Sequence, residues 1–221
     1  MKKIIILSDV HYPVPSIETV KSIIAKESFD KLIFLGDVID TTYSSMDFAS
    51  LWKEFFNNVF SIVPLSKIVV LYGDNDISIT VKGTASKVAN YELEIAKAIG
   101  IPALKTYRLG NMFFFHGNME TSHLVEKIGY YAVKTANRLG ATNIIPKQLA
   151  LTIESKYKTE KMYNFFGHIH LLQKYDDIKA VFCGTLNSQN IIYQNSIGYV
   201  VIEANDNYEI ESMDKIELKQ I

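Results

Sequence analysis

The chain has 221 residues, of which 48% are apolar and 21% are charged, and its net charge is −1. These values exclude an intrinsically disordered chain and give no sign of a protein that coats nucleic acid or anionic membranes. Cys183 is the only cysteine, which excludes an internal disulfide and a zinc site of several cysteines, so a reducing, cytoplasmic setting is expected. No apolar stretch approaches the ~20 residues that a membrane span needs.

The first half of the chain alternates predicted strands with predicted helices. Continuous apolar runs predict buried strands over residues 3–8, 31–35 and 67–72. Apolar residues at helical spacing predict helices over residues 16–28, 45–62 and 87–99. This alternation is typical of an α/β fold with a parallel sheet at its core.

The second half is richer in predicted strands. The turn signal Gly110-Asn111 joins predicted strands over 104–109 and 111–115. Further strands are predicted over residues 162–166, 179–183, 189–193, 197–203 and 208–213. We expect this group to form an antiparallel meander. Helices are predicted over residues 119–139 and 146–157. Because no repeat or linker divides the chain, we expect one domain over residues 1–221, with a helical lid inserted at about 119–158.

Acidic residues and histidines follow directly after five of the predicted strands. The first three strands are followed by Asp9-Val10-His11, Gly36-Asp37-Val38-Ile39-Asp40 and Gly73-Asp74-Asn75-Asp76. Two later strands are followed by His116-Gly117 and Gly167-His168-Ile169-His170. Each motif alone has an ordinary explanation, such as a turn or a helix cap. Ligands of open α/β sheets bind beyond the carboxyl ends of the strands, so the five motifs together predict one site.

In this order, the motifs resemble those of the calcineurin-like metallophosphoesterases, which read Asp-x-His, Gly-Asp-x-x-Asp, Gly-Asn-x-Asp, His-Gly and Gly-His-x-His. The resemblance covers residues 9 to 170, and the strand-rich C-terminal part also fits. It implies a four-layer αββα sandwich, in which two mixed β-sheets lie face to face between helices. The metal site would lie in the loops at one edge.

The resemblance also implies seven ligands for two metal ions. One ion would be held by Asp9, His11 and His170, the other by Asp74, His116 and His168, and Asp37 would bridge them. Mixed imidazole and carboxylate ligands favour divalent transition metals, so we expect manganese first, with iron, zinc, cobalt or nickel as alternatives. Such a pair lowers the pKa of a shared water toward ~7, and the resulting bridging hydroxide would attack phosphorus.

Two positions depart from the family pattern. Asp74 stands where family members normally have asparagine, and its extra negative charge predicts tighter metal binding and a weaker pull on an anionic phosphate. The alternative is a shift of one residue that makes Asn75 the ligand. Asn75 stands where many members have a histidine that pairs with the residue equivalent to Asp40. Asparagine can donate a hydrogen bond to a phosphoryl oxygen but cannot deliver a proton near neutral pH.

Asn75 and Asp40 are therefore the candidate catalytic residues, with two alternatives. Asp40 could be purely structural, and His123 could replace the missing acid if the lid brings it inward. Family branches that lack the histidine tend to be phosphodiesterases.

We expect an enzyme that hydrolyses phosphodiester or pyrophosphate bonds of a small-molecule phosphate ester. The alternatives are a partner-binding module with little or no catalysis, and a nuclease, although no cluster of lysines predicts a groove for nucleic acid. The physiological substrate and the oligomeric state do not follow from the sequence.

Overall fold

The computed structural model describes residues 1–26, 28–40, 47–73, 76, 97–116, 161–187 and 197–218. Several predictions lie outside these residues: the lid at 119–158, most of the helix at 87–99, the strand at 189–193, and the residues Asp74, Asn75 and His123. Among the described residues, none of the helices has the length and apolar character needed to cross a membrane.

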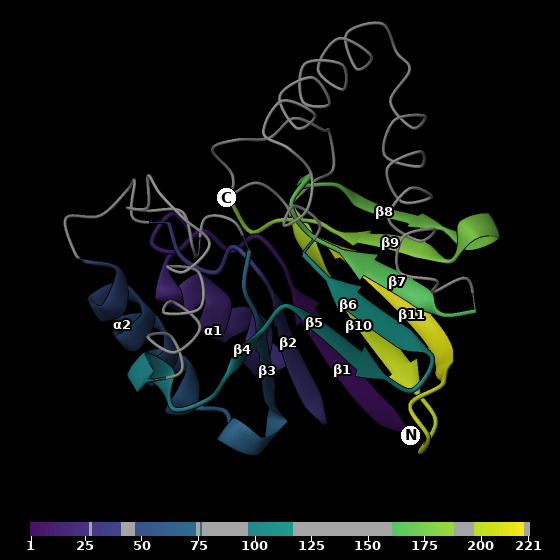
Figure 1. The fold of residues 1–221 in the computed structure, drawn as a ribbon, viewed down its shortest axis with the longest axis horizontal. Coiled ribbons are helices and arrows are strands. Elements are labelled where there is room, and N and C mark those ends of the chain that lie inside the picture. Colours follow the sequence, from purple (N-terminus) through teal and green to yellow (C-terminus); the bar gives the residue numbers. More distant parts are fainter. Residues whose placement is uncertain are drawn as a thin grey trace, which may run out of the picture.

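Strands from both ends of the chain form a six-stranded mixed sheet (Figure 1). Its order is β11-β10-β1-β2-β3-β4. The parallel strands are β1 (Lys2–Leu7), β2 (Lys31–Leu35), β3 (Ile68–Leu71) and β4 (Ala103–Leu104). The strands β10 (Gly198–Ala204) and β11 (Ile210–Glu217) add to β1 in antiparallel fashion. The predicted parallel core is therefore confirmed.

The middle of the chain forms a second mixed sheet of five strands, in the order β5-β6-β7-β9-β8. The strands are β5 (Thr106–Leu109), β6 (Met112–Phe115), β7 (Tyr163–Phe166), β8 (Leu172–Tyr175) and β9 (Ala180–Cys183). Within it, β6, β7 and β9 are parallel, and the outer strands β5 and β8 are antiparallel to their neighbours. The predicted antiparallel meander is wrong, because its strands are divided between the two sheets.

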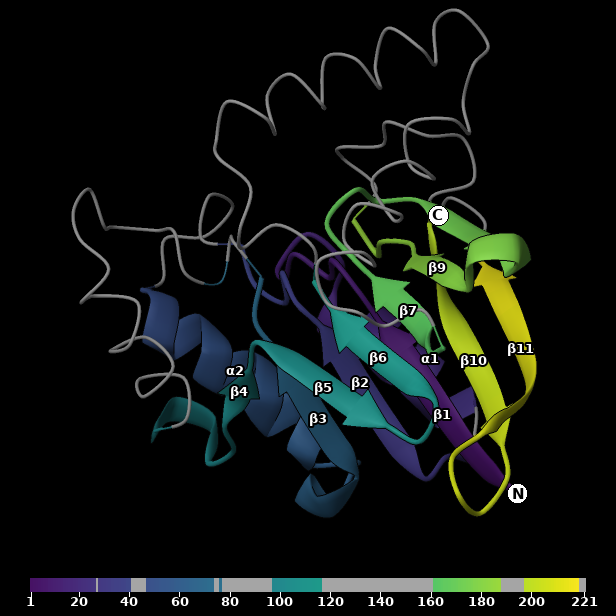
Figure 2. The ribbon, with the colours of Figure 1, turned by 45° about the vertical axis from the view of Figure 1, so that its right-hand side comes forward.

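The two sheets lie face to face and share an apolar core, as Figures 1 and 2 show. Alternation along β1 decides which side chains enter it. Ile4 and Ile6 point into the core between the sheets, whereas Ile5 and Leu7 point to the opposite face. Each fully buried aliphatic side chain stabilises the fold by about 1.5–3 kcal/mol. The predicted pair of mixed sheets in contact is confirmed.

The helices α1 (Ile17–Lys26) and α2 (Phe48–Phe60) cover the outer face of the first sheet. Both begin after a capping residue. Ser16 Oγ accepts a hydrogen bond from the Thr19 N–H at 3.2 Å, and Asp47 Oδ1 accepts one from the Ser50 N–H at 3.0 Å. Because Asp47 is the cap, α2 begins three residues later than the predicted range. Its apolar face carries Trp52, which is fully buried.

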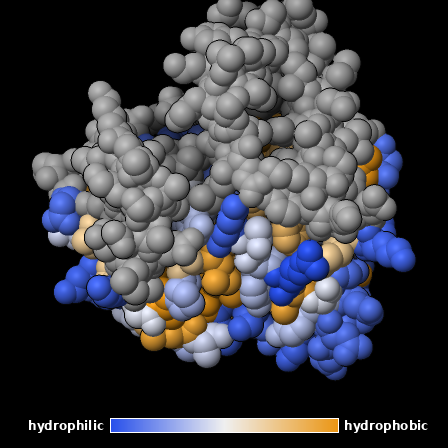
Figure 3. Space-filling model, viewed as in Figure 1, coloured by the Kyte–Doolittle hydropathy of each residue, from blue (hydrophilic) through white to orange (hydrophobic). Residues whose placement is uncertain are grey.

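The exposed side chains of the edge strand β11 are mostly charged, and they include Glu211, Asp214 and Lys215. On the face seen in Figure 3, hydrophilic residues of the described part gather at the lower right, near the N-terminus and the turn between β10 and β11. Charged edges of this kind discourage pairing with strands of other molecules.

Candidate metal centre

The loops that follow β1 and β2 continue the parallel ladder beyond the strands themselves. The N–H of Asp9 donates to the carbonyl of Gly36 at 3.1 Å, and the N–H of His11 donates to the carbonyl of Asp37 at 2.9 Å. This register holds the Asp-x-His motif beside the Gly-Asp motif. The backbone therefore brings these two motifs together beyond the carboxyl ends of the strands, as predicted for ligand sites of α/β sheets.

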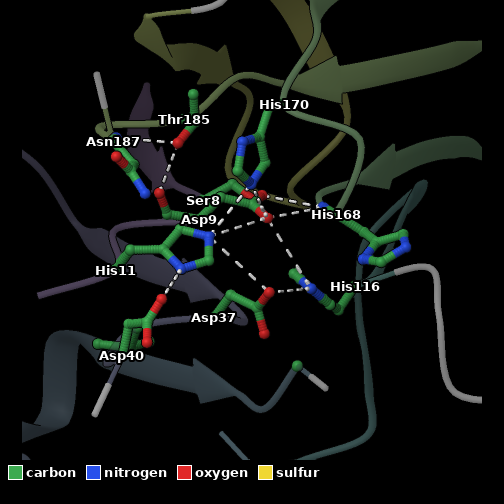
Figure 4. Close-up of polar contacts among 12 residues, drawn as sticks. Ser8, Asp9, His11, Asp37, Asp40, His116, His168, His170, Thr185 and Asn187 are labelled. Carbon is green, nitrogen blue, oxygen red and sulfur yellow. Dashed lines mark hydrogen bonds and ion pairs between the residues drawn. The ribbon is translucent and has the colours of Figure 1, made fainter. Parts of the chain in front are cut away.

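The second sheet contributes its ligand candidates from the ends of β6 and β7. The N–H of Gly167 donates to the carbonyl of His116 at 3.1 Å, so these two loops also run side by side. The backbone N–H of His168 then donates to both carboxylate oxygens of Asp9, at 3.0 and 2.9 Å. This contact joins the two sheets directly at the site (Figure 4).

One group of three side chains consists of Asp9, His11 and His170. The Nε2 atoms of the two histidines lie 3.1 Å apart, and Oδ1 of Asp9 lies 3.3 Å from Nε2 of His170 and 4.0 Å from Nε2 of His11. Donor atoms that bind one metal through bonds of about 2.1 Å lie roughly 3.0–3.4 Å apart. Two of the three distances lie in this range and fit a shared cation, whereas Oδ1 of Asp9 and Nε2 of His11 are farther apart, at 4.0 Å.

The second group consists of Asp37, His116 and His168, whose donor atoms lie within 4.8 Å of one another. Oδ2 of Asp37 is 3.3 Å from Nε2 of His116, and it is also 3.9 Å from Nε2 of His11 in the first group. A single carboxylate oxygen therefore faces a histidine of each group.

The hydrogen bond of His116 fixes which ring nitrogen can bind a cation. Its Nδ1 lies 2.7 Å from the carbonyl oxygen of Leu35, and a carbonyl only accepts, so Nδ1 carries the proton. In a neutral ring, Nε2 then presents its lone pair toward the carboxylate of Asp37. Two facing acceptors repel each other unless a proton or a cation lies between them, so this arrangement suits a metal.

The pKa values of Asp9 and His11 reflect the charge of the site. Burial alone would raise the pKa of the Asp9 carboxyl, but His116, His170 and His11 together lower it from 3.8 to about 2. Burial also opposes the charged form of His11, yet the carboxylates of Asp40, Asp37 and Asp9 raise its pKa above the ordinary value. The buried carboxylates thus favour positive charge at the position that a metal ion would take.

Three glycines allow the ligand-bearing loops to pack against one another. A Cβ atom at Gly36 would overlap the imidazole of His116, and one at Gly73 would overlap the carboxylate of Asp37. A Cβ atom at Gly167 would overlap the hydroxyl of Ser8. In three of the five motifs, the leading glycine is therefore required by close approach.

Five of the six clustered residues have a left-handed backbone, with φ of 49° at Asp9, 51° at His11, 49° at Asp37, 66° at His168 and 51° at His170. Such angles cost non-glycine residues about 1–2 kcal/mol each. Strained backbone concentrates at functional sites, and here it turns each side chain toward a common centre. The sequence carries no signal that would have revealed it.

Further buried residues hold the loops in place, although the residue patterns alone predicted no functional role for them. The carboxylate of Asp76 accepts from the N–H groups of Val38, Ile39 and Gly73, at 3.0, 3.2 and 2.8 Å. Burial and the neighbouring Asp37 raise the pKa of Asp76 to about 7. Asp76 therefore connects the loop after β3 to the loop after β2.

Two hydroxyl groups position Asp9. The hydroxyl of Ser8 donates to Oδ2 of Asp9, and the hydroxyl of Thr185 donates to the backbone carbonyl of Asp9 at 2.7 Å. Thr185 also accepts from the N–H of Asn187 at 2.9 Å, so the turn after β9 closes over the end of β1.

The structure brings together all the predicted metal ligands that it describes, namely Asp9, His11, Asp37, His116, His168 and His170. Predicted ligand Asp74 and candidate catalytic residue Asn75 lie outside the described residues. The carboxylate of Asp40, the other candidate catalytic residue, lies 3.4 Å from Nδ1 of His11.

The fold and the site define an α/β protein of two facing mixed sheets, with two adjacent groups of metal-binding side chains at the ends of the strands. A model of the calcineurin-like phosphoesterase family matches residues 2–185. The chain therefore belongs to this family, whose members are generally phosphoesterase hydrolases and typically bind divalent metals.

Solved structures of similar fold cover nearly the whole chain. A metallophosphoesterase from Sphaerobacter thermophilus is 14% identical, with 99% of this chain and 89% of that chain covered and a TM-score of 0.50. Wild-type Vps29 from Entamoeba histolytica, complexed with zinc, is 11% identical, with 97% and 98% covered and a TM-score of 0.50. An archaeal phosphodiesterase is 18% identical, with 98% and 99% covered and a TM-score of 0.49. A search of curated proteins finds no match. At these identities the likeness shows the fold alone.

Proposed function

We propose that this protein is a dinuclear metal-dependent phosphoesterase that hydrolyses phosphodiester or pyrophosphate bonds. Asp37 is the bridging ligand between the two groups, and Asp74 completes the second group. The observation that carries the proposal is the position of Asp37 Oδ2, at 3.3 Å from Nε2 of His116 and 3.9 Å from Nε2 of His11. A shared ligand must face a histidine of each group. Oδ1 of Asp9 also does so, at 3.3 Å from Nε2 of His170 and 3.9 Å from Nε2 of His116, and the family motif assigns the bridge to Asp37.

When bound, a pair of divalent ions supplies an activated water and the positive charge that neutralises phosphoryl oxygens. The chain's own residues hold the ligands in position beforehand. Ser8 and the N–H of His168 orient the carboxylate of Asp9, and Leu35 orients the ring of His116. Ligands held in this way lose little freedom on binding, which favours tight and well-ordered metal sites.

Charge and proton supply both favour a diester over a monoester. The carboxylates of Asp9, Asp37 and Asp74 offset most of the charge of two divalent ions, so the site attracts a doubly charged monoester only weakly. Asn75 cannot protonate a leaving group near neutral pH. We also infer manganese as the native metal from the mixed ligand set, and a cytoplasmic setting from the lone Cys183.

Purified protein reloaded with manganese is expected to bind two ions per chain and to hydrolyse bis-p-nitrophenyl phosphate faster than p-nitrophenyl phosphate. Elemental analysis and release of p-nitrophenol measure the two quantities. Protein treated with a chelator is the control, and readdition of manganese should restore its activity. If the protein binds both ions and cleaves neither compound, the hydrolase assignment is wrong.

Replacement of Asn75 with histidine is expected to raise monoesterase activity at least tenfold, because general acid catalysis contributes about 10²–10⁴-fold. Hydrolysis of p-nitrophenyl phosphate by the manganese-loaded variant measures the gain. Asn75→Gln is the matched control and should show no gain, since an amide delivers no proton. Inactivity of all three proteins with metal bound would favour a partner-binding module.

A further inference from the structure

Asp40 lies on the opposite side of the His11 ring from the other donor atoms (Figure 4). Its Oδ2 atom is 3.4 Å from Nδ1 of His11. Nε2 of the same ring faces His170 at 3.1 Å and Asp37 at 3.9 Å. One nitrogen of His11 therefore faces the candidate metal position, and the other faces a carboxylate.

The backbone holds Asp40 in this place. The N–H of Asp40 donates to the carbonyl of Tyr12 at 2.8 Å, and the N–H of Tyr12 donates to the carbonyl of Val38 at 2.9 Å. Tyr12 and Ile39 also form an isolated parallel bridge. Asp40 is only 9% exposed, so its carboxylate faces the protein rather than open solvent.

We propose that Asp40 is a positioning residue for His11: its carboxylate accepts the Nδ1 proton and directs the Nε2 lone pair to the ion held with Asp9 and His170. An acceptor at Nδ1 selects the tautomer that binds metal through Nε2, and a carboxylate also makes the ring a stronger donor. In the second group, the neutral carbonyl of Leu35 has the corresponding place beside His116. Asp40 thus acts through His11 and not on the substrate.

This inference rests on the proposed function, because it assigns a role to Asp40 only if the first group binds an ion. Asp40→Ala is expected to lower the affinity for one of the two ions by about 10–100-fold and to leave the other unchanged. Asp40→Asn should lose less, since its amide oxygen can still accept from Nδ1. Titration of chelator-treated protein with manganese, against a competing chelator, measures both affinities.

Asp206→Asn is the control for loss of one negative charge, because that side chain is 85% exposed and forms an ion pair with the N-terminus at 3.7 Å, away from the candidate metal centre. It should bind both ions with the wild-type affinities. Melting temperatures of the metal-free proteins show whether each variant folds. The absorption spectrum of cobalt-loaded protein should change in the Asp40 variants and not in Asp206→Asn, because a merely structural role would leave the ligand geometry unaltered.

A double-mutant cycle tests whether Asp40 acts through His11. His11→Ala alone removes a ligand, and adding Asp40→Ala to it should cause no further loss of metal affinity. At saturating manganese, kcat of Asp40→Ala should return to within a few-fold of the wild type if Asp40 contributes chiefly through metal binding.

Three results would overturn the inference: wild-type affinity for both ions in Asp40→Ala, an undiminished effect of Asp40→Ala in the His11→Ala background, or a kcat that stays low at saturating metal. A wild-type protein that binds no manganese would instead overturn the proposed function itself. The two failures are therefore distinguishable.

Discussion

Replacement of Asp37 with asparagine is expected to lower phosphodiesterase activity by about 10³-fold or more and to release at least one of the two metal ions. The side chain is only 2% exposed, and its Oδ2 atom faces a histidine of each group. An amide of the same shape cannot supply a negative charge shared by two cations. Elemental analysis and hydrolysis of bis-p-nitrophenyl phosphate, each at a fixed manganese concentration, measure the two losses.

Asparagine is the better first variant because residue 37 has a φ of 49°, an angle that asparagine tolerates and alanine does not. Its backbone can therefore keep the hydrogen bond with the N–H of His11. Asp176→Asn, a change of an exposed carboxylate away from the site, is the matched control and should retain both ions. Full metal content and activity in both Asp37→Asn and Asp37→Ala would refute the bridging role.

Local sequence patterns were sufficient for the three central parallel strands of the first sheet. β1, β2 and β3 are continuous apolar runs, and such runs predict strands buried on both faces. β8 (Leu172–Tyr175) was missed because Gln173 and Lys174 interrupt its apolar residues, as expected for a half-exposed edge strand. The predicted strand 104–109 is two strands, since the chain leaves the first sheet at Lys105 and enters the second. The sheet that a strand joins depends on tertiary structure, so local periodicity does not predict where the chain passes from one sheet to the other.

The candidate ligands could be predicted because strand ends of parallel sheets converge, and the family resemblance supplied their pairing. The contacts that hold these ligands in position could not be predicted. Asp40 and His11 belong to different motifs, and they face each other because the loops that carry them pair in parallel. Asp76 binds three backbone N–H groups from two loops, which no residue pattern encodes. These contacts depend on loop geometry and on the left-handed backbone of the ligands.

Gly36 combines a left-handed backbone angle with a close approach to a candidate ligand. Its φ is 84°, and a Cβ atom there would overlap the ring of His116. Gly36→Ala is therefore expected to lower the free energy of unfolding by about 2–4 kcal/mol, which combines left-handed strain with overpacking. Because the displaced ring is a candidate ligand whose Nδ1 donates to Leu35, the variant should also lose affinity for the second ion. Urea unfolding and manganese titration measure the two effects.

Gly100 is the matched control for the strain alone. Its φ is 75°, and a Cβ atom there would meet no atom of the described residues within 4 Å, apart from its own chain neighbours. Gly100→Ala should therefore cost only about 1–2 kcal/mol and leave metal binding unchanged. The difference between the two variants isolates the contact with His116 from the cost of the backbone angle. Equal losses of stability with intact metal binding in both would mean that the loop after β2 can move away from the ring, and that the glycine of this motif serves only the turn.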